Sequence, residues 1–214
     1  MKSVINHKIL SVCVGAIFLL FSSFSFALDI PRDDPEKMVA ALSNVLVKTI
    51  NERRAELEAS PKSVKAFANE YVLPYIDTKK MARYVMGRYW RTASDTQKVS
   101  FVNAFSNTLI RSYSKSLLKL HIELVDVRPA QPVKPGRVTV PSIVDQADGN
   151  RTDVVYRAYL NDKTKQWMLY DVSIEGISML LNYRKAYASD FSKKGIDAVI
   201  TEMEAKNVDF NGGL

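Results

Sequence analysis

The fold is decided by residues 122–174, which read IELVDVRPAQPVKPGRVTVPSIVDQADGNRTDVVYRAYLNDKTKQWMLYDVSI. This stretch contains four runs rich in β-branched and aromatic residues, at positions 122–128, 137–144, 152–160 and 166–174. Prolines, glycines and asparagines separate the runs, as is typical of turns. Because short turns connect consecutive runs, the sequence predicts a four-stranded antiparallel meander. Apolar and polar residues alternate in the third run, so one face of this sheet is expected to be apolar.

Helical patterns precede this sheet. Apolar residues recur every three or four positions in four segments, and each segment begins with a capping signal. These signals are Asp34-Pro35, Ser60-Pro61, Asp77, and Ser94 with Gln97 three residues later. The first helix is expected to extend to about Glu58, and the helix at residues 94–120 is expected to be the longest.

A further helical pattern follows the sheet. It begins after Gly176, and Gly195 is expected to interrupt it. The sequence therefore predicts an α+β fold, in which a helical N-terminal half packs on a four-stranded antiparallel meander sheet with C-terminal helices.

Residues 1–27 have the composition of a cleavable export signal. Lys2 and Lys8 precede an apolar run at residues 9–26, and Ser25-Phe26-Ala27 is a small-x-small cleavage site. A retained membrane anchor is the alternative, although serines dilute the run and it is short for spanning hydrocarbon. Cleavage after Ala27 would also remove the only cysteine. We expect a signal peptide at 1–27, a single domain at 28–206 and a flexible tail at 207–214.

The expected mature chain is mildly basic. Removing Lys2 and Lys8 from 30 Lys+Arg leaves 28 against 23 Asp+Glu, a net charge of +5. Outside the cytoplasm, such an excess suits anionic lipid headgroups or acidic protein surfaces. Nucleic acid is not an expected partner, because no dense basic stripe with interleaved aromatic residues is present. An ordinary solvated surface is the alternative.

Catalytic motifs are scarce. After Ala27 the chain has one histidine, His121, and no cysteine, nucleophile elbow, phosphate-binding glycine loop or clustered metal ligands. We therefore predict no catalytic residues, no metal and no cofactor. Asp171 and Glu175 are candidates for an acid/base pair. A structural role is the favoured interpretation, because a carboxylate just before Gly176 and the following helix is well placed to bind the free N–H groups of that helix.

The helices and strands carry much apolar surface. In the helix at 94–120, Phe101, Ile110 and Leu118 widen the apolar stripe, so this helix is expected to pack against the sheet or border a cavity. Composition alone favours a solid core over a cavity.

Several short motifs resemble one family. They are YVLPYID at 71–77, Met81-Ala82, VMGRYW at 85–90, Ala93-Ser94, residues 101–105, YDVSIEGISM at 170–179 and KGID at 194–197. Together, and in this order, they resemble the MlaC family of periplasmic phospholipid carriers in the Mla lipid-asymmetry pathway, also called toluene-tolerance proteins. The resemblance covers nearly the whole chain after the export signal.

The resemblance implies a soluble periplasmic carrier without enzymatic activity. Such a carrier buries the acyl chains of a glycerophospholipid in an apolar pocket and shuttles the lipid between outer and inner membranes, which maintains outer-membrane asymmetry. The implied partners are an outer-membrane Mla lipoprotein complex and an inner-membrane Mla ABC transporter with its periplasmic lipid-binding hexamer. Two alternatives are a periplasmic lipid hydrolase acting through Asp171, Glu175 or His121, and a chaperone that binds apolar protein segments.

Candidate site residues come from the apolar patterns and from the matching motifs. The residues expected to line a lipid-tail pocket are Met81, Tyr84, Val85, Phe105, Leu109, Tyr113, Leu117, Tyr156, Trp167, Val172, Ile174, Ile177 and Leu181. The candidates for contact with a headgroup or an acidic partner are Lys79, Lys80, Arg83 and Arg88. A solvated helix face is the alternative for any one of these four.

Overall fold

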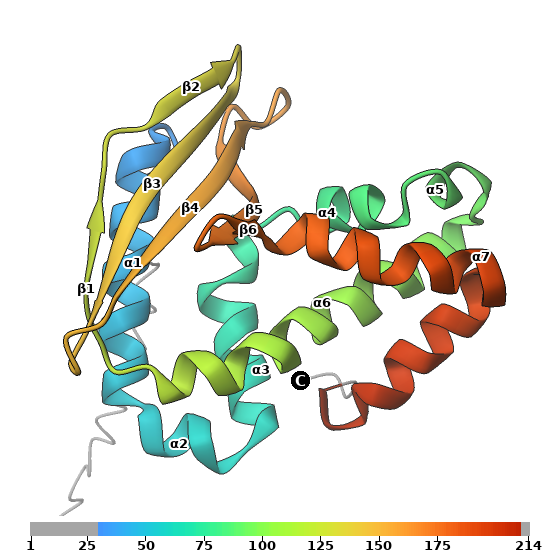
Figure 1. Cartoon of the computed structure of the whole chain (residues 1–214), viewed down its shortest axis with the longest axis horizontal. Helices are drawn as coiled ribbons and strands as arrows, with labels where there is room; N and C mark the ends of the chain where they lie inside the picture. Colours follow the sequence, from blue (N-terminus) through green and yellow to red (C-terminus); the bar gives the residue numbers. More distant parts are fainter. Residues whose placement is uncertain (1–29, 211–214) are drawn as a thin grey trace, which may run out of the picture.

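A twisted antiparallel sheet lies at one side of the molecule and most helices lie at the other (Figure 1). The computed structural model describes residues 30–210, so the predicted export signal lies outside the described residues. The helices are α1 (Pro35–Glu52), α2 (Arg54–Ala59), α3 (Pro61–Tyr71), η1 (Leu73–Tyr75), α4 (Thr78–Met86), α5 (Tyr89–Thr92), α6 (Asp95–Lys119), α7 (Met179–Lys206) and η2 (Val208–Phe210). The strands are β1 (Ile122–Val127), β2 (Gln131–Lys134), β3 (Arg137–Gln146), β4 (Arg151–Leu160), β5 (Trp167–Ile174) and β6 (Ile177–Ser178).

The predicted α+β class is confirmed, but the sheet has six strands rather than four. The strand order is β1-β3-β4-β5-β6, and β2 pairs with β3 beyond this path. The sequence pattern missed β2 because Pro132 lies within it, and proline argues against a strand unless the strand lies at an edge or a bulge, as β2 does. It missed β6 because this strand has two residues and is paired through a tight turn at Glu175 and Gly176, both with positive φ.

The predicted capping signals begin the helices as expected. The Asp34 carboxylate accepts hydrogen bonds from the N–H groups of Glu36 and Lys37, which start α1. Ser94 and Gln97 form a reciprocal capping box at the start of α6, which is the longest uninterrupted helix at 25 residues. The chain of α7 is longer, but Gly195 has φ 79° and ψ 175° and interrupts it as predicted.

The first helix is shorter than expected. It ends at Glu52 instead of extending to about Glu58, and α2 begins after a break at Arg53. The break turns Leu57 into the interior, where its side chain is buried. The Arg54 guanidinium donates to the Leu118 carbonyl at the end of α6, which holds α2 against that helix.

Two separate cores stabilise these layers. One lies between α1 and the sheet, and its buried residues include Met38, Val39, Val140 and Ala158. The other lies among α4, α6 and α7, where Phe101, Phe105 and Phe191 are buried. In this second core the ring centroid of Phe101 lies 5.9 Å from that of Phe105 and 5.5 Å from that of Phe191. The space between the two cores, bordered by α2 and α3, contains the site described below.

Residues 207–210 of the expected tail lie against the domain, where Asn207 and Phe210 are buried, whereas residues 211–214 lie outside the described part of the chain. Asn207 is fully buried, and its amide Nδ2 donates to the Ala104 carbonyl and to Thr108 Oγ1, both at 2.9 Å. Its Oδ1 accepts from Arg111 Nε at 2.8 Å. These contacts fix the end of α7 on the middle of α6, because a buried amide is stable only when its donors and acceptor are satisfied.

We predict that Asn207→Leu lowers the free energy of unfolding by about 2–4 kcal/mol, because it leaves the Arg111 guanidinium and the Ala104 carbonyl without this partner. Urea denaturation followed by circular dichroism measures the change. The matched control is Asn103→Leu on the exposed face of α6, which should change stability by no more than about 0.5 kcal/mol. Equal stabilities for the two variants would contradict the role of Asn207.

Candidate functional site

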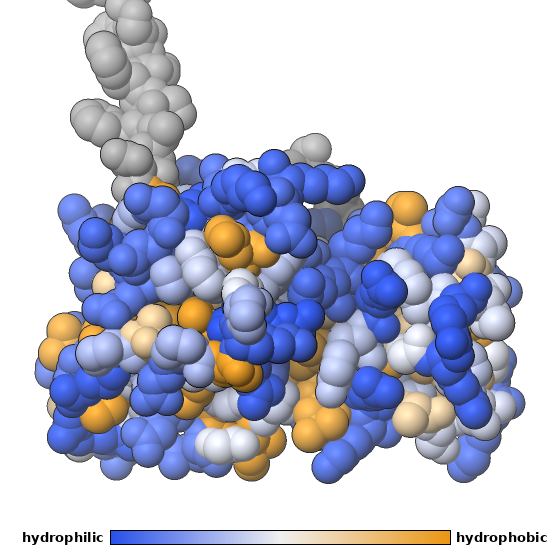
Figure 2. Space-filling view, turned by 90° about the horizontal axis from the view of Figure 1, so that it is seen from above, coloured by the Kyte–Doolittle hydropathy of each residue, from blue (hydrophilic) through white to orange (hydrophobic). Residues whose placement is uncertain are grey.

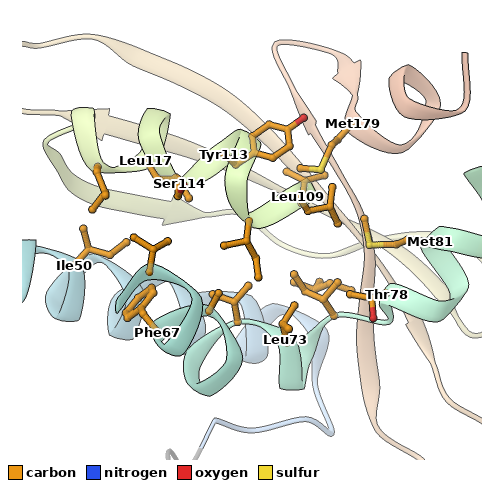
Figure 3. Close-up of a pocket in the computed structure, with 18 of the residues that line it drawn as sticks. Ile50, Phe67, Leu73, Thr78, Met81, Leu109, Tyr113, Ser114, Leu117 and Met179 are labelled. Atoms are coloured by element: carbon orange, nitrogen blue, oxygen red, sulfur yellow. The ribbon is translucent and has the colours of Figure 1, made fainter. Parts of the chain in front are cut away.

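An apolar cavity of about 200 Å³ lies between the two cores. Helices α2 and α3 line it on one side and α6 lines it on the other, with β5 and the starts of α4 and α7 at one end (Figure 3). The lining residues are Ile50, Leu57, Val64, Phe67, Ala68, Val72, Leu73, Ile76, Thr78, Met81, Leu109, Ile110, Tyr113, Ser114, Leu117, Leu118, Leu169, Asp171, Val172 and Met179. Since nearly all of them present hydrocarbon or thioether groups, the cavity suits an apolar ligand and offers water few partners.

The cavity is elongated. In Figure 3, Ile50, Phe67 and Leu117 lie at one end, whereas Met81 and Met179 lie at the other. One wall is closed where Ala68 of α3, Ile110 of α6 and Phe210 of η2 pack together. The small side chain of Ala68 leaves room that a larger residue would occupy. A long, narrow apolar space of this kind matches a linear hydrocarbon chain better than a compact ring system.

The phenol of Tyr113 reports a dry environment beside the cavity. Burial raises its pKa to about 12, and the neighbouring Tyr183 ring, with its centroid 6.4 Å away, acts in the same direction. Tyr113 therefore stays neutral near pH 7, and the cavity acquires no charge from it.

Asp171 lies at the Met179 end of the cavity and is the main polar group there. It is 2% exposed, and its carboxylate accepts four hydrogen bonds. The donors are Arg157 Nη1 at 2.7 Å, Ser178 Oγ at 2.6 Å, Val172 N at 2.9 Å and Leu180 N at 3.0 Å. The role expected of the carboxylate just before Gly176, which is to bind N–H groups at the start of the following helix, is filled by Asp171 through the Leu180 N–H and not by Glu175. A carboxylate has about four lone-pair sites, so these donors leave no free oxygen lone pair for acid/base chemistry.

The other two residues of the hydrolase alternative are placed elsewhere. The Glu175 carboxylate lies in the exposed turn between β5 and β6 and accepts from the Asp153 N–H at 2.7 Å. His121 is exposed at the junction of α6 and β1. Within residues 30–210, no group of three or more His, Cys, Asp or Glu side chains is arranged to hold a metal ion.

A second hollow, which we call the basic groove, has a volume of about 790 Å³. It lies between α4, the start of α7 and strands β3, β4 and β5, and its lining residues are Lys80, Arg83, Tyr84, Gly87, Val133, Arg137, Arg157, Tyr170, Asp171, Ser178, Leu180, Leu181 and Arg184. Asp171 lines both the cavity and the groove. Burial lowers the pKa of Lys80, and the positive charges of Arg137 and Arg83 add to this against the opposing effect of Asp77.

The chain was compared with known proteins. Residues 40–205 match the MlaC protein family, a match that extends over most of the chain. The chain belongs to the MlaC family. A curated relative is the intermembrane phospholipid transport system binding protein MlaC of Haemophilus influenzae, 21% identical over 177 residues, which are 82% of this chain and 83% of that protein. A solved structure, the phospholipid-binding protein from Ralstonia solanacearum in complex with a phospholipid, has the same fold with a TM-score of 0.75 at 22% identity. The matched region is 84% of this chain and 99% of the Ralstonia solanacearum chain.

Five of the pocket residues expected from the sequence line the cavity of this MlaC-family chain. They are Met81, Leu109, Tyr113, Leu117 and Val172. Three of them follow each other at four-residue spacing along α6, which is the helix whose wide apolar stripe indicated a cavity or a sheet contact. The apolar stripe therefore faces the cavity along the C-terminal half of α6.

The other expected pocket residues lie outside the cavity. Val85 and Phe105 are in the solid core among α4, α6 and α7, and Tyr156 and Trp167 pack in the core between α1 and the sheet. Tyr84 and Leu181 line the basic groove, and Ile174 of β5 and Ile177 of β6 are exposed. Periodicity identified these residues as apolar-face positions, but it does not specify which neighbour the face meets.

Sequence patterns missed the wall formed by α2 and α3. Its residues Leu57, Val64, Phe67, Ala68 and Val72 line the cavity, and the last four follow helical spacing that could have indicated them. Of the motifs that resemble the MlaC family, YVLPYID at residues 71–77 reaches this wall at its end, where it includes Val72.

Of the four basic residues expected to contact a headgroup or an acidic partner, two line the basic groove and two lie outside it. Lys80 and Arg83 line the basic groove, whereas Lys79 is exposed on α4 outside it. Arg88 lies outside the groove and donates to the Tyr89 hydroxyl at 2.9 Å.

We predict opposite outcomes for one substitution at two of these positions. Val85 is 2% exposed in the solid core, so Val85→Lys buries an ammonium group and should unfold the domain, at a cost above about 4 kcal/mol. Leu117 is 43% exposed at the cavity, so Leu117→Lys can extend its ammonium group to water and should keep the fold. It should nevertheless weaken binding of the apolar dye N-phenyl-1-naphthylamine severalfold.

Circular dichroism and dye fluorescence check both outcomes. Val99→Lys, at an exposed position of α6 away from the cavity, is the control and should change neither quantity. A folded Val85→Lys protein, or a Leu117→Lys protein with full dye binding, would contradict the assignment of the two positions.

Proposed function

We propose that this chain is a periplasmic phospholipid carrier, which shelters the acyl chains of a glycerophospholipid in the cavity while the lipid crosses the aqueous space between two membranes. The observation that carries the proposal is the elongated apolar cavity between α3 and α6. Membership of the MlaC family supports it. So do the relative named as a phospholipid transport binding protein and the neighbour solved with a phospholipid.

The energetics of the cavity suit a carrier. Each acyl methylene moved from water into an apolar space contributes about 0.8 kcal/mol, so long chains remain bound while water surrounds the protein. Measured against a bilayer, this contribution nearly vanishes, because lipid tails are as apolar as the cavity lining. A lipid can therefore leave at a membrane or at an apolar partner without any bond being broken.

Acyl chains require more space than the cavity offers when it is empty. Its volume of about 200 Å³ is below the roughly 300–1,000 Å³ of pockets for drug-sized ligands. We infer that lipid insertion separates α2 and α3 from α6. This wall is held by the hydrogen bond from Arg54 to the Leu118 carbonyl and by the small cluster of Ala68, Ile110 and Phe210, whereas α4, α6 and α7 share a large aromatic core. The wall at α3 is therefore the cheaper one to displace, and docking to a partner is the step that opens it.

The family also indicates the setting of the transport. Export through the signal at residues 1–27 would bring the chain to the periplasm, where the proposed partners are the outer-membrane Mla lipoprotein complex and the inner-membrane Mla ABC transporter with its lipid-binding hexamer. In this arrangement the chain moves lipid between the two membranes and maintains outer-membrane asymmetry. None of the helices in the described range has a stretch long and apolar enough to span a bilayer.

The surface offers less support for a chaperone. Most of the strongly exposed hydrophobic residues lie on separate elements, among them Val99, Leu124, Val133 and Val208, whereas Ile174 and Ile177 are neighbours across β5 and β6. Figure 2 shows one face of the molecule on which hydrophilic residues surround small separate groups of hydrophobic ones. A chaperone for apolar protein segments would need a contiguous patch.

We predict that the protein purified without detergent carries phospholipid, which organic extraction and mass spectrometry recover with both acyl chains intact. Ala68→Phe places a ring in the cavity and should lower the lipid content severalfold, while overpacking costs about 1–3 kcal/mol of stability. Ala55→Phe, at an exposed position of α2, is the matched control and should retain the lipid.

An empty wild-type protein would contradict the carrier proposal. Recovery of free fatty acid and lysolipid in place of intact phospholipid would favour the hydrolase alternative instead.

A further inference from the structure

The basic groove contains more positive charge than its surroundings neutralise. Five cationic side chains converge on it: Lys80 and Arg83 from α4, Arg137 from β3, Arg157 from β4 and Arg184 from α7. The one carboxylate in the groove, Asp171, is engaged with Arg157 at 2.7 Å. Among the residues that the structure describes, the other four cations form no ion pair. Four like charges around one hollow repel each other and attract an anion.

Aromatic rings hold three of these cations in place. Lys80 Nζ lies 3.5 Å from the centroid of the Tyr159 ring, and the Arg184 guanidinium lies 4.7 Å from that of Tyr84. The Arg137 guanidinium lies 5.9 Å from the centroid of Tyr170. Contact with a ring face orients a cation and leaves most of its N–H donors free. The donors therefore stay available for an anion in the groove.

The groove begins where the apolar cavity ends. Met81 lines the cavity and the preceding residue, Lys80, lines the groove. In the same way, Met179 lines the cavity, whereas Leu180 and Leu181 line the groove. Figure 3 shows Met81 and Met179 together at one end of the cavity. Asp171 borders both spaces, and its pairing with Arg157 neutralises the one negative charge there.

We propose that the basic groove is a phosphate-binding site. Guanidinium groups match phosphate oxygens with paired N–H donors, and several of them directed at one hollow suit a tetrahedral anion with more than one acceptor oxygen. Two sources share this chemistry: the phosphodiester of a lipid headgroup and free inorganic phosphate. The position of the groove at the end of the cavity favours the headgroup of the lipid whose chains occupy the cavity, and this choice rests on the proposed function.

The test compares ligands in the mature protein after its co-purified lipid has been removed by organic extraction and the protein refolded. Dioctanoylphosphatidylglycerol has the phosphate, dioctanoylglycerol lacks it, and inorganic phosphate lacks the tails. Isothermal titration calorimetry measures all three with wild type and with Arg83→Gln/Arg184→Gln, both exposed positions in the groove. The control, Arg91→Gln/Lys193→Gln, removes the same charge from exposed positions outside the groove. Thermal unfolding verifies that both double variants fold.

We expect wild type to bind the phospholipid about tenfold more tightly than the diacylglycerol. This ratio corresponds to the binding free energy that one charge-assisted hydrogen bond contributes. The groove variant should lose this preference and bind the diacylglycerol as wild type does, and the control should keep the preference. Inorganic phosphate that binds wild type but not the groove variant, without any preference between the lipids, would support the site and assign it to free phosphate.

Equal binding of both phosphate-containing ligands by wild type and the groove variant would overturn the phosphate site while leaving the carrier intact. If neither dioctanoyl ligand binds wild type, the proposed carrier function fails, and the inorganic phosphate titration alone then supports or overturns the site.

Discussion

The position of the helices around the cavity depends on the hydrogen bonds that the buried Asp171 carboxylate accepts. This carboxylate joins β4 through Arg157, β6 through Ser178 and the start of α7 through the Leu180 N–H. The far end of α7 is fixed on α6 by Asn207. Because α7 is attached at both ends, α6 keeps a fixed position relative to β5, and the space between α6 and α3 is not closed by collapse of the helices onto the sheet.

This attachment separates a rigid part of the molecule from a part that can yield. The aromatic core among α4, α6 and α7 is tightly filled, with Phe101 and Phe105 fully buried. Across the cavity, α3 meets α6 through small contacts that include Ala68 and Ile110. Displacing α3 therefore exposes little surface that was well packed before, whereas displacing α4 or α7 would break a core whose large side chains each contribute several kcal/mol. An apolar chain that enters the cavity replaces the contacts that α3 gives up.

Local signals in the sequence were enough for most of the fold, and they were insufficient where the structure depends on distant contacts. Side-chain caps such as Asp34 and Ser94 act within three residues, so they could be recognised. The pairing of β2 and the burial of Asn207 depend on partners far along the chain. The same limit applies to the site: the α6 stripe predicted Leu109, Tyr113 and Leu117, but nothing local distinguishes a residue facing a cavity from one in a filled core. Arg137, Arg157 and Arg184 join Lys80 and Arg83 only after folding, so the groove could not be predicted.

Photocrosslinking shows whether acyl chains occupy the space between α3 and α6. A phospholipid with a diazirine near the end of one acyl chain is loaded onto the protein, irradiated, and located by peptide mass spectrometry. We expect crosslinks to Phe67, Leu109 and Leu117, which line the cavity. Crosslinks confined to exposed residues such as Val133 and Ile177, with none on α3 or α6, would contradict this position of the acyl chains.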